Sequence, residues 1–263
     1  MKKILYLLTL AGVFVGCTKG NEYDAKLDTP DGIYVTGDAT LFSTETSYGM
    51  LQEMQDPRLH SLMTWIASEG SFHISLVGAE HTPVVYGKSG EVLPNGDAVS
   101  YDLERGGAGF TVTHEGFYQL VYNSSLGQLT VIPVSMRLLG EEAMTEAGAR
   151  EVMFAAPTYD RENHVVSWLT AEEPQRILAG EYKFAYTADG TQHVALTGDS
   201  DFVLPTVYTG PEASSKTNFL TGEWQTLTGP SDGNLTLKRQ GHHILSLCYV
   251  VPPHRFTARP HRR

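Results

Sequence analysis

The chain repeats one ordered set of short strand-like segments between residues 32 and 252. The first copy runs through residues 33–39, 63–66, 69–74, 83–87 and 115–120, and the second through 136–142, 166–169, 179–184, 193–198 and 240–245. A fixed order of segments that occurs twice indicates two copies of one domain rather than one large enzyme fold. A second tethered site raises effective concentration without new chemistry, so the repeat favours binding over catalysis.

Within each copy, short apolar or alternating runs are separated by Gly, Asn, Asp and Pro. We interpret Phe72–Leu76 and Tyr118–Tyr122 as alternating runs, which are typical of half-buried strands. Similar runs predict further strands at residues 128–134, 182–186, 235–237 and 244–251, with turns at 94–97 and 123–127. Helical spacing is scarce, and only residues 47–63 and 141–150 could hold short helical turns.

Many short strands at regular spacing predict an all-β chain of two tandem antiparallel β-sandwich (Ig-like) modules. The restart after Pro133 puts module 1 at residues 32–134 and module 2 at 135–252. Cys248 lies in an apolar run, where a lone thiol is most often a small buried side chain.

The first residues are typical of an export signal. Lys2 and Lys3 precede an apolar run at 4–15, too short to span a bilayer, and then Gly16 and Cys17. This pattern predicts a lipoprotein signal peptide at 1–16, lipidation of Cys17 and a polar tether at 17–31. The alternative is an ordinary cleaved signal in which Cys17 is incidental.

The formal net charge of −11 disfavours nucleic acid as a partner, because such binding depends on phosphate neutralisation by Lys and Arg. The exception is the segment 253–263, where Arg255, Arg259, Arg262 and Arg263 cluster. We interpret it as a solvated basic tail; the alternative is a contact with lipid headgroups or a partner.

Several of the repeated segments carry a family resemblance. They are Gly37-Asp38, Trp65 and Gly70-Ser71-Phe72 in the first copy, and Gly140, Trp168 and Ala179-Gly180-Glu181-Tyr182-Lys183-Phe184 in the second. In this order, and behind a lipid anchor, they resemble the repeated domains of the SusE/SusF type of outer-membrane starch-binding lipoproteins. The family pattern departs at Glu141, which replaces an Asp, and at His81 and His193, near which the family often has Trp.

The resemblance implies tandem β-sandwich modules that capture an oligo- or polysaccharide for an import system. It also implies an outer-membrane location through the lipid anchor, at the cell surface, with the periplasmic face as the alternative. The partners it implies are a TonB-dependent porin and a companion binding lipoprotein, as in polysaccharide utilisation systems. It does not name the glycan.

Aromatic rings that stack on the apolar faces of sugars are the candidate site residues. Trp65 and Trp168 recur in strand segments of both copies, so we expect them in the core. Trp224 lies among Gly and polar residues and is the first candidate for glycan binding, with a half-buried strand-end Trp as the alternative. Weaker candidates are the aromatic residues Tyr86, Tyr101 and Tyr208 and the polar residues Lys88, Arg105 and Asn218.

No nucleophile elbow, zinc helix or phosphate loop occurs in the sequence. His242 and His243 are adjacent and would point to opposite faces of a strand, which makes them poor joint metal ligands. We therefore predict a non-enzymatic chain without cofactor or metal that binds polysaccharide. The main alternative is an anchored structural or fimbria-like surface protein with a protein partner, and a more distant one is a glycan hydrolase.

Overall fold

The structure is a computed structural model, and it is all-β and antiparallel with almost no helix. It describes residues 29–54, 56–80, 82–91, 98–140, 142–169, 175–178, 180–188, 193–195, 203–205, 207–209, 225–227, 235–237, 241–250 and 255–262. In these ranges the only helical element is the 3₁₀ turn η1 (Ser47–Gly49). The described part of the chain contains no helix with the length and apolar character needed to cross a membrane.

The first half forms one curled sheet. Its strands are β1 (Gly32–Thr36), β2 (Gln52–Glu53), β3 (Leu59–Ile66), β4 (His73–Val77), β5 (Val84–Glu91), β6 (Val99–Arg105), β7 (Gly116–Asn123) and β8 (Gln128–Gly140). Neighbouring strands follow the order β1-β4-β5-β6-β8-β7-β3-β2. The two ends of this path meet, because Tyr34 of β1 bridges to Met50 and the Leu51 N–H donates to the Ile33 carbonyl at 2.8 Å, just before β2.

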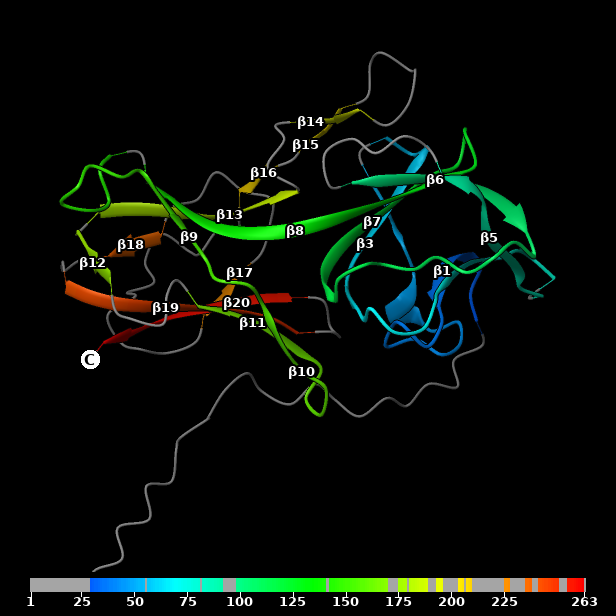
Figure 1. The fold of residues 1–263 in the computed structure, drawn as a ribbon, viewed down its shortest axis with the longest axis horizontal. Coiled ribbons are helices and arrows are strands. Elements are labelled where there is room, and N and C mark those ends of the chain that lie inside the picture. Colours follow the sequence, from blue (N-terminus) through cyan, green and yellow to red (C-terminus); the bar gives the residue numbers. More distant parts are fainter. Residues whose placement is uncertain are drawn as a thin grey trace, which may run out of the picture.

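The second half extends the same sheet and adds another (Figure 1). Its strands are β9 (Glu151–Met153), β10 (Thr158–Asp160), β11 (Val165–Leu169), β12 (Gln175–Ile177), β13 (Gly180–Ala188), β14 (His193–Ala195), β15 (Val203–Pro205), β16 (Val207–Thr209), β17 (Gln225–Leu227), β18 (Leu235–Leu237), β19 (Gly241–Val250) and β20 (Arg255–Arg262). β9 and β13 pair with β8, and β16 and β18 pair with β13. A six-stranded sheet has the order β10-β11-β19-β20-β17 with β12 beside β19, and β14 pairs with β15.

The thirteen-residue strand β8 crosses the predicted module boundary and belongs to both halves (Figure 1). Residues 128–133 pair with β7, while residues 134–140 pair with β13. Pro133 therefore lies inside a strand rather than at its exit. On one side of β8, pairing with β6 stops at Val131 and pairing with β13 starts at Val134. Pro133 therefore pairs with β7 alone. A proline, which has no N–H to donate, is tolerated where one side of the strand is unpaired.

The all-β antiparallel prediction is confirmed, whereas the tandem Ig-like sandwich is not. One curled sheet takes the place of two facing sheets in the first half, and strands of both halves join β8 at successive stretches without alternating along it. The division into modules at 32–134 and 135–252 stays a prediction.

One hydrophobic cluster contains buried residues of both halves. Trp65 and Trp168 are 7% and 1% exposed, which confirms that both belong to the core. Phe117 of β7 lies at the centre of the join, because its ring meets Trp168 and Tyr249 edge-on at centroid distances of 5.1 and 4.8 Å. Aromatic pairs prefer such edge-to-face geometry.

The Gly-Asp segment that opens the first copy is a structural connection between β1 and the start of β4. Asp38 accepts a hydrogen bond from the Ser71 N–H at 2.7 Å. Gly37 has φ of 144° and Gly70 has φ of 87°, values that residues with a side chain rarely adopt. A Cβ on Gly70 would also lie 2.7 Å from the Asp38 carboxylate, so glycine is needed there.

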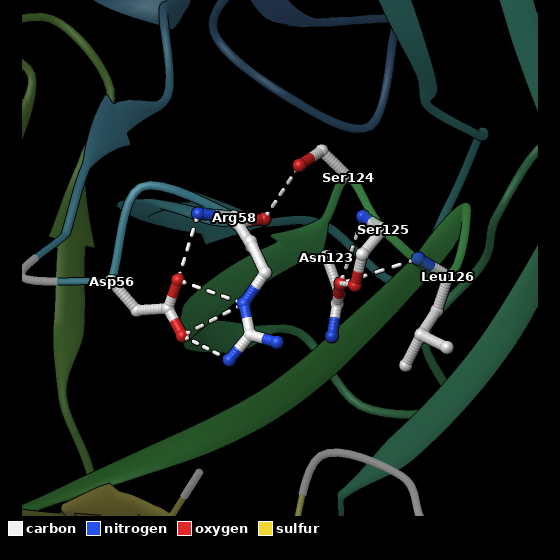
Figure 2. Close-up of polar contacts among 6 residues, drawn as sticks. All are labelled: Asp56, Arg58, Asn123, Ser124, Ser125 and Leu126. Carbon is white, nitrogen blue, oxygen red and sulfur yellow. Dashed lines mark hydrogen bonds and ion pairs between the residues drawn. The ribbon is translucent and has the colours of Figure 1, made fainter. Parts of the chain in front are cut away.

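Polar loops secure the end of the curled sheet at which β7 turns into β8 (Figure 2). Both the N–H and the hydroxyl of Ser124 donate to the Arg58 carbonyl, at 2.7 and 2.9 Å. The Asn123 carboxamide oxygen accepts from the N–H groups of Ser125 and Leu126. These bonds give the backbone groups of an exposed turn partners within the protein.

Of the two segments expected to hold short helical turns, residues 47–63 contain one, the three-residue η1, and then lead into β2 and β3. The described residues of 141–150 form turns without a helix, so that expectation is wrong. The basic tail is not free in solvent, because Arg255–Arg262 form β20, paired with β19 and β17. The clustered charges hid the period-two spacing of Phe256, Ala258 and Pro260, which is typical of a strand.

Candidate functional site

A groove of about 520 Å³ opens at the end of the curled sheet where β7 begins. Tyr101 of β6 and Val131 of β8 line it together with Tyr118 of β7, and residues 111–115 form its rim. Pro157 adds a lining residue from the second half. Ligand sites commonly occur at the mouths of β-barrels and between domains, and this volume lies within the range of about 300–1,000 Å³ that small-molecule sites have.

Aromatic rings form much of the inner part of the groove. Tyr101 is 7% exposed and packs edge-on against Phe110 at 5.4 Å between centroids, with the Lys88 ammonium 5.7 Å from its ring centroid. The Tyr118 hydroxyl donates to the His114 carbonyl at 2.6 Å. Burial raises the pKa of Tyr118, so this hydroxyl stays protonated at neutral pH.

The rim is polar and exposed. Thr111, Thr113, His114 and Glu115 line the groove on the segment that leads into β7. Glu115 also approaches Arg161 of the second half at 3.8 Å, and both side chains are more than half exposed, so the ion pair contributes little stability. The groove is therefore lined by largely buried aromatic residues and by exposed hydroxyl, imidazole and carboxylate groups.

This arrangement suits binding of a neutral, hydroxyl-rich ligand. Tyr101 and Tyr118 are 7% and 9% exposed, so they offer a ligand a small apolar ring area rather than whole ring faces. The exposed rim can both donate and accept hydrogen bonds. Among the described residues, no three His, Cys, Asp or Glu side chains lie close enough together to hold a metal ion.

The structure brings one of the sequence-predicted site residues into the groove, Tyr101. Tyr86 is half-buried in β5 and pairs with Arg105, four residues along β6 from Tyr101. That spacing corresponds to roughly 13 Å at about 3.3 Å per residue. Tyr86 therefore lies toward the other end of the sheet.

Other candidates lie outside what the structure describes. Trp224, Asn218 and Cys17 are outside the described residues, and Tyr208 is known only by its place in β16, opposite Tyr186. The sequence interpretation missed Tyr118 and the rim 111–115. The signal was available in Thr111-Val112-Thr113-His114-Glu115, a polar stretch directly before an aromatic strand.

Comparisons with known proteins give one distant likeness to report. No family model matches the chain, and no curated protein matches it. The crystal structure of SusF from Bacteroides thetaiotaomicron resembles it with a TM-score of 0.32 and 13% identity, over 90% of this chain and 50% of SusF. The chain thus spans half the length of SusF, and at this low TM-score nothing about site or ligand is taken from it.

Proposed function

We propose that this chain is a non-catalytic glycan-binding protein and that the groove beside Tyr101 and Tyr118 is a binding site. The observation that carries the proposal is the combination of aromatic rings with an exposed polar rim in one groove of about 520 Å³. Sugars present apolar C–H faces and many hydroxyls, so they match both surfaces. The repeated segments and their resemblance to starch-binding lipoproteins point to the same class of ligand.

Calorimetric titration against starch, dextran, xyloglucan, arabinoxylan, mannan and pectin tests the proposal. We expect at least one polymer to bind, and Glu115→Gln and His114→Ala to weaken that binding. Both residues are exposed, so the substitutions leave the fold intact. Glu104→Gln is the matched control, because Glu104 is an exposed carboxylate on β6 outside the groove lining.

Three outcomes contradict the proposal. A wild-type protein that binds none of the polymers removes the glycan function and favours the anchored structural or fimbria-like role. Equal effects of Glu115→Gln and Glu104→Gln would mean that the groove is not the site. Release of reducing sugar from a bound polymer would identify a hydrolase instead.

Trp224 remains a proposed second site, because its Gly-rich, polar surroundings in sequence are not explained by a core pattern. Trp224→Ala should weaken glycan binding by about tenfold or more, as loss of a stacked aromatic contact does. The melting temperature should stay almost unchanged. If Trp224→Ala abolishes binding while the groove variants bind normally, the site is at Trp224 and not in the groove.

We also propose that the protein is held in the outer membrane by lipid on Cys17, at the cell surface. The support is the sequence of residues 1–17, which has the order of a lipoprotein signal. Cys17→Ala should release the protein from the membrane fraction. Equal incorporation of radiolabelled palmitate into the variant and the wild type would refute the anchor.

A further inference from the structure

One segment of the second half, residues 157–161, approaches the first half at or beside the groove at three points. Pro157 lines the groove, Arg161 approaches the rim residue Glu115, and between them Tyr159 of β10 stacks on Trp65 of β3. The Trp65 and Tyr159 ring centroids are 5.2 Å apart and the planes are 19° from parallel. Of these contacts the ring stack alone involves a buried partner, since Trp65 is 7% exposed.

The turn between β10 and β11, which follows this segment, is held by its own hydrogen bonds. The Asp160 carboxylate accepts hydrogen bonds from the N–H groups of Glu162 and Asn163, at 3.0 and 3.1 Å, and from the Asn163 side chain at 2.7 Å. The Tyr159 hydroxyl lies 3.2 Å from Nδ1 of His164, which has a φ of 55°. Tyr159 therefore connects a closely bonded loop to the core of the first half.

We propose that the groove is one binding site shared by both halves, and that Tyr159 is the positioning residue that holds the 157–161 wall against the 111–115 rim. This inference rests on the proposed glycan function and adds that the ligand is an oligosaccharide stretch that contacts both walls. The exposed pair of Glu115 and Arg161 is too weak to hold the wall alone. The stack on Trp65, whose cross-strand neighbour Phe117 lines the groove, is the buried contact that holds the wall in place.

Tyr159→Ala tests the inference, with Tyr159→Phe as the matched variant that keeps the ring and loses the hydroxyl. Amide hydrogen exchange in the free protein is the first measurement. We expect Tyr159→Ala to raise exchange at residues 116–118 of β7, which pair with Thr64, Trp65 and Ile66 of β3. These residues lie more than 40 positions from Tyr159 in the sequence. Tyr159→Phe should leave their exchange unchanged. Ile33→Ala, in β1 and outside the groove lining, controls for general destabilisation.

The second measurement is calorimetric affinity for the polymer of the panel that binds wild type most tightly. Tyr159→Ala should weaken it by about tenfold, within the range seen for residues that act on a site through packed neighbours. Tyr159→Phe should bind as wild type does. Wild-type affinity in Tyr159→Ala, or unchanged exchange at 116–118, overturns the inference.

The two measurements separate this inference from the proposed function. If no polymer binds the wild-type protein, the glycan proposal is wrong, and so is the proposal that the shared site binds an oligosaccharide. The exchange result still decides whether Tyr159 positions the groove wall. If wild type binds and the groove variants weaken binding while Tyr159→Ala changes neither measurement, the site belongs to the first half alone.

Discussion

Trp65 lies face to face with Tyr159, with ring centroids 5.2 Å apart, and this contact joins the first half of the chain to the second. The other duplicated tryptophan, Trp168, meets Phe117 edge-on across the same join. Both tryptophans that recur in the repeat thus serve the contact between halves. The repeat explains why they are apolar strand residues, and the structure adds that they hold two halves together.

Phe117→Ala should weaken this join more than any comparable change in the first half. Phe117 is 2% exposed and contacts both Trp168 and Tyr249, so truncation leaves a cavity on the seam. We expect a loss of about 3–5 kcal/mol in the free energy of unfolding. Urea unfolding followed by tryptophan fluorescence and by far-UV circular dichroism measures it.

Phe110→Ala is the matched control, because Phe110 is fully buried against Phe72 and Tyr101 within the first half. It should cost a similar free energy while the two optical signals still change together. In Phe117→Ala the two signals should separate, since the halves lose a shared contact. Separate transitions already in wild type would mean that the halves fold independently and that the seam contributes little.

Gly37→Ala should be far more destabilising than Gly106→Ala. Both positions have positive φ, 144° for Gly37 and 70° for Gly106. An alanine at a φ near 70° costs roughly 1–2 kcal/mol, whereas a φ of 144° lies in a region that glycine alone commonly adopts. A Cβ on Gly37 would also lie 2.5 Å from the Phe72 Cα and collide with the Ser71 carbonyl, whereas one on Gly106 meets nothing within 4 Å. Thermal unfolding of the two variants checks this, and equal melting temperatures would contradict it.

The class of fold could be read from the sequence because alternation is a local signal. The run 72–76 shows it and lies in or beside β4. The run 118–122 lies in β7, which is buried on both faces and is apolar except for Gln119. The curled sheet could not be read from the sequence, because it depends on the pairing of β1 with residues near β2, which are distant along the chain. The continuity of β8 depends in the same way on its pairing with β7 and β13. Pro133 suggested a boundary for a sound local reason, yet a strand with a free flank accommodates a proline.

The candidate site was predictable only in part. Tyr101 was selected for its turn-rich surroundings, and it lines the groove although Phe110 buries most of its ring. Tyr118 belongs to a repeated segment and was therefore assigned to the fold. Pro157 and Glu115 are 42 positions apart in the sequence, so only the docking of the two halves brings them to one groove.

Asn123→Ala should destabilise the turn between β7 and β8. Asn123 is 8% exposed. Its side-chain oxygen accepts hydrogen bonds from two backbone N–H groups and from the Ser125 hydroxyl. Ser125 and Leu126 are exposed, so water can replace the lost acceptor, and we expect a cost of about 0.5–1.5 kcal/mol, that of an ordinary hydrogen bond. Ser124→Ala is the control, because the Ser124 N–H still donates to Arg58, and its unfolding free energy should fall less.

Asp160→Asn should be less stable than wild type at neutral pH and should lose that disadvantage in acid. The hydrogen bond from the Asn163 side chain is the main cause that lowers the pKa of Asp160, and the N–H groups of Asn163 and Glu162 add to it. The folded state therefore favours the carboxylate. Its contribution is complete above the unfolded pKa of about 3.9 and is lost as pH falls through the lower folded pKa.

The size of this effect is limited by solvent, because Asp160 is exposed and screening keeps such contributions below about 1 kcal/mol. That corresponds to a difference of roughly 1–3 °C in melting temperature at pH 7 for a chain of this length. Glu162→Gln is the control, since it changes a carboxylate in the same loop and keeps the backbone donor. Melting curves from pH 7 down to pH 2 should show the wild-type and Asp160→Asn values converging below about pH 3.9, while Glu162→Gln stays parallel to wild type. A constant gap between wild type and Asp160→Asn across that range would mean that the ionised form of Asp160 does not stabilise the hairpin.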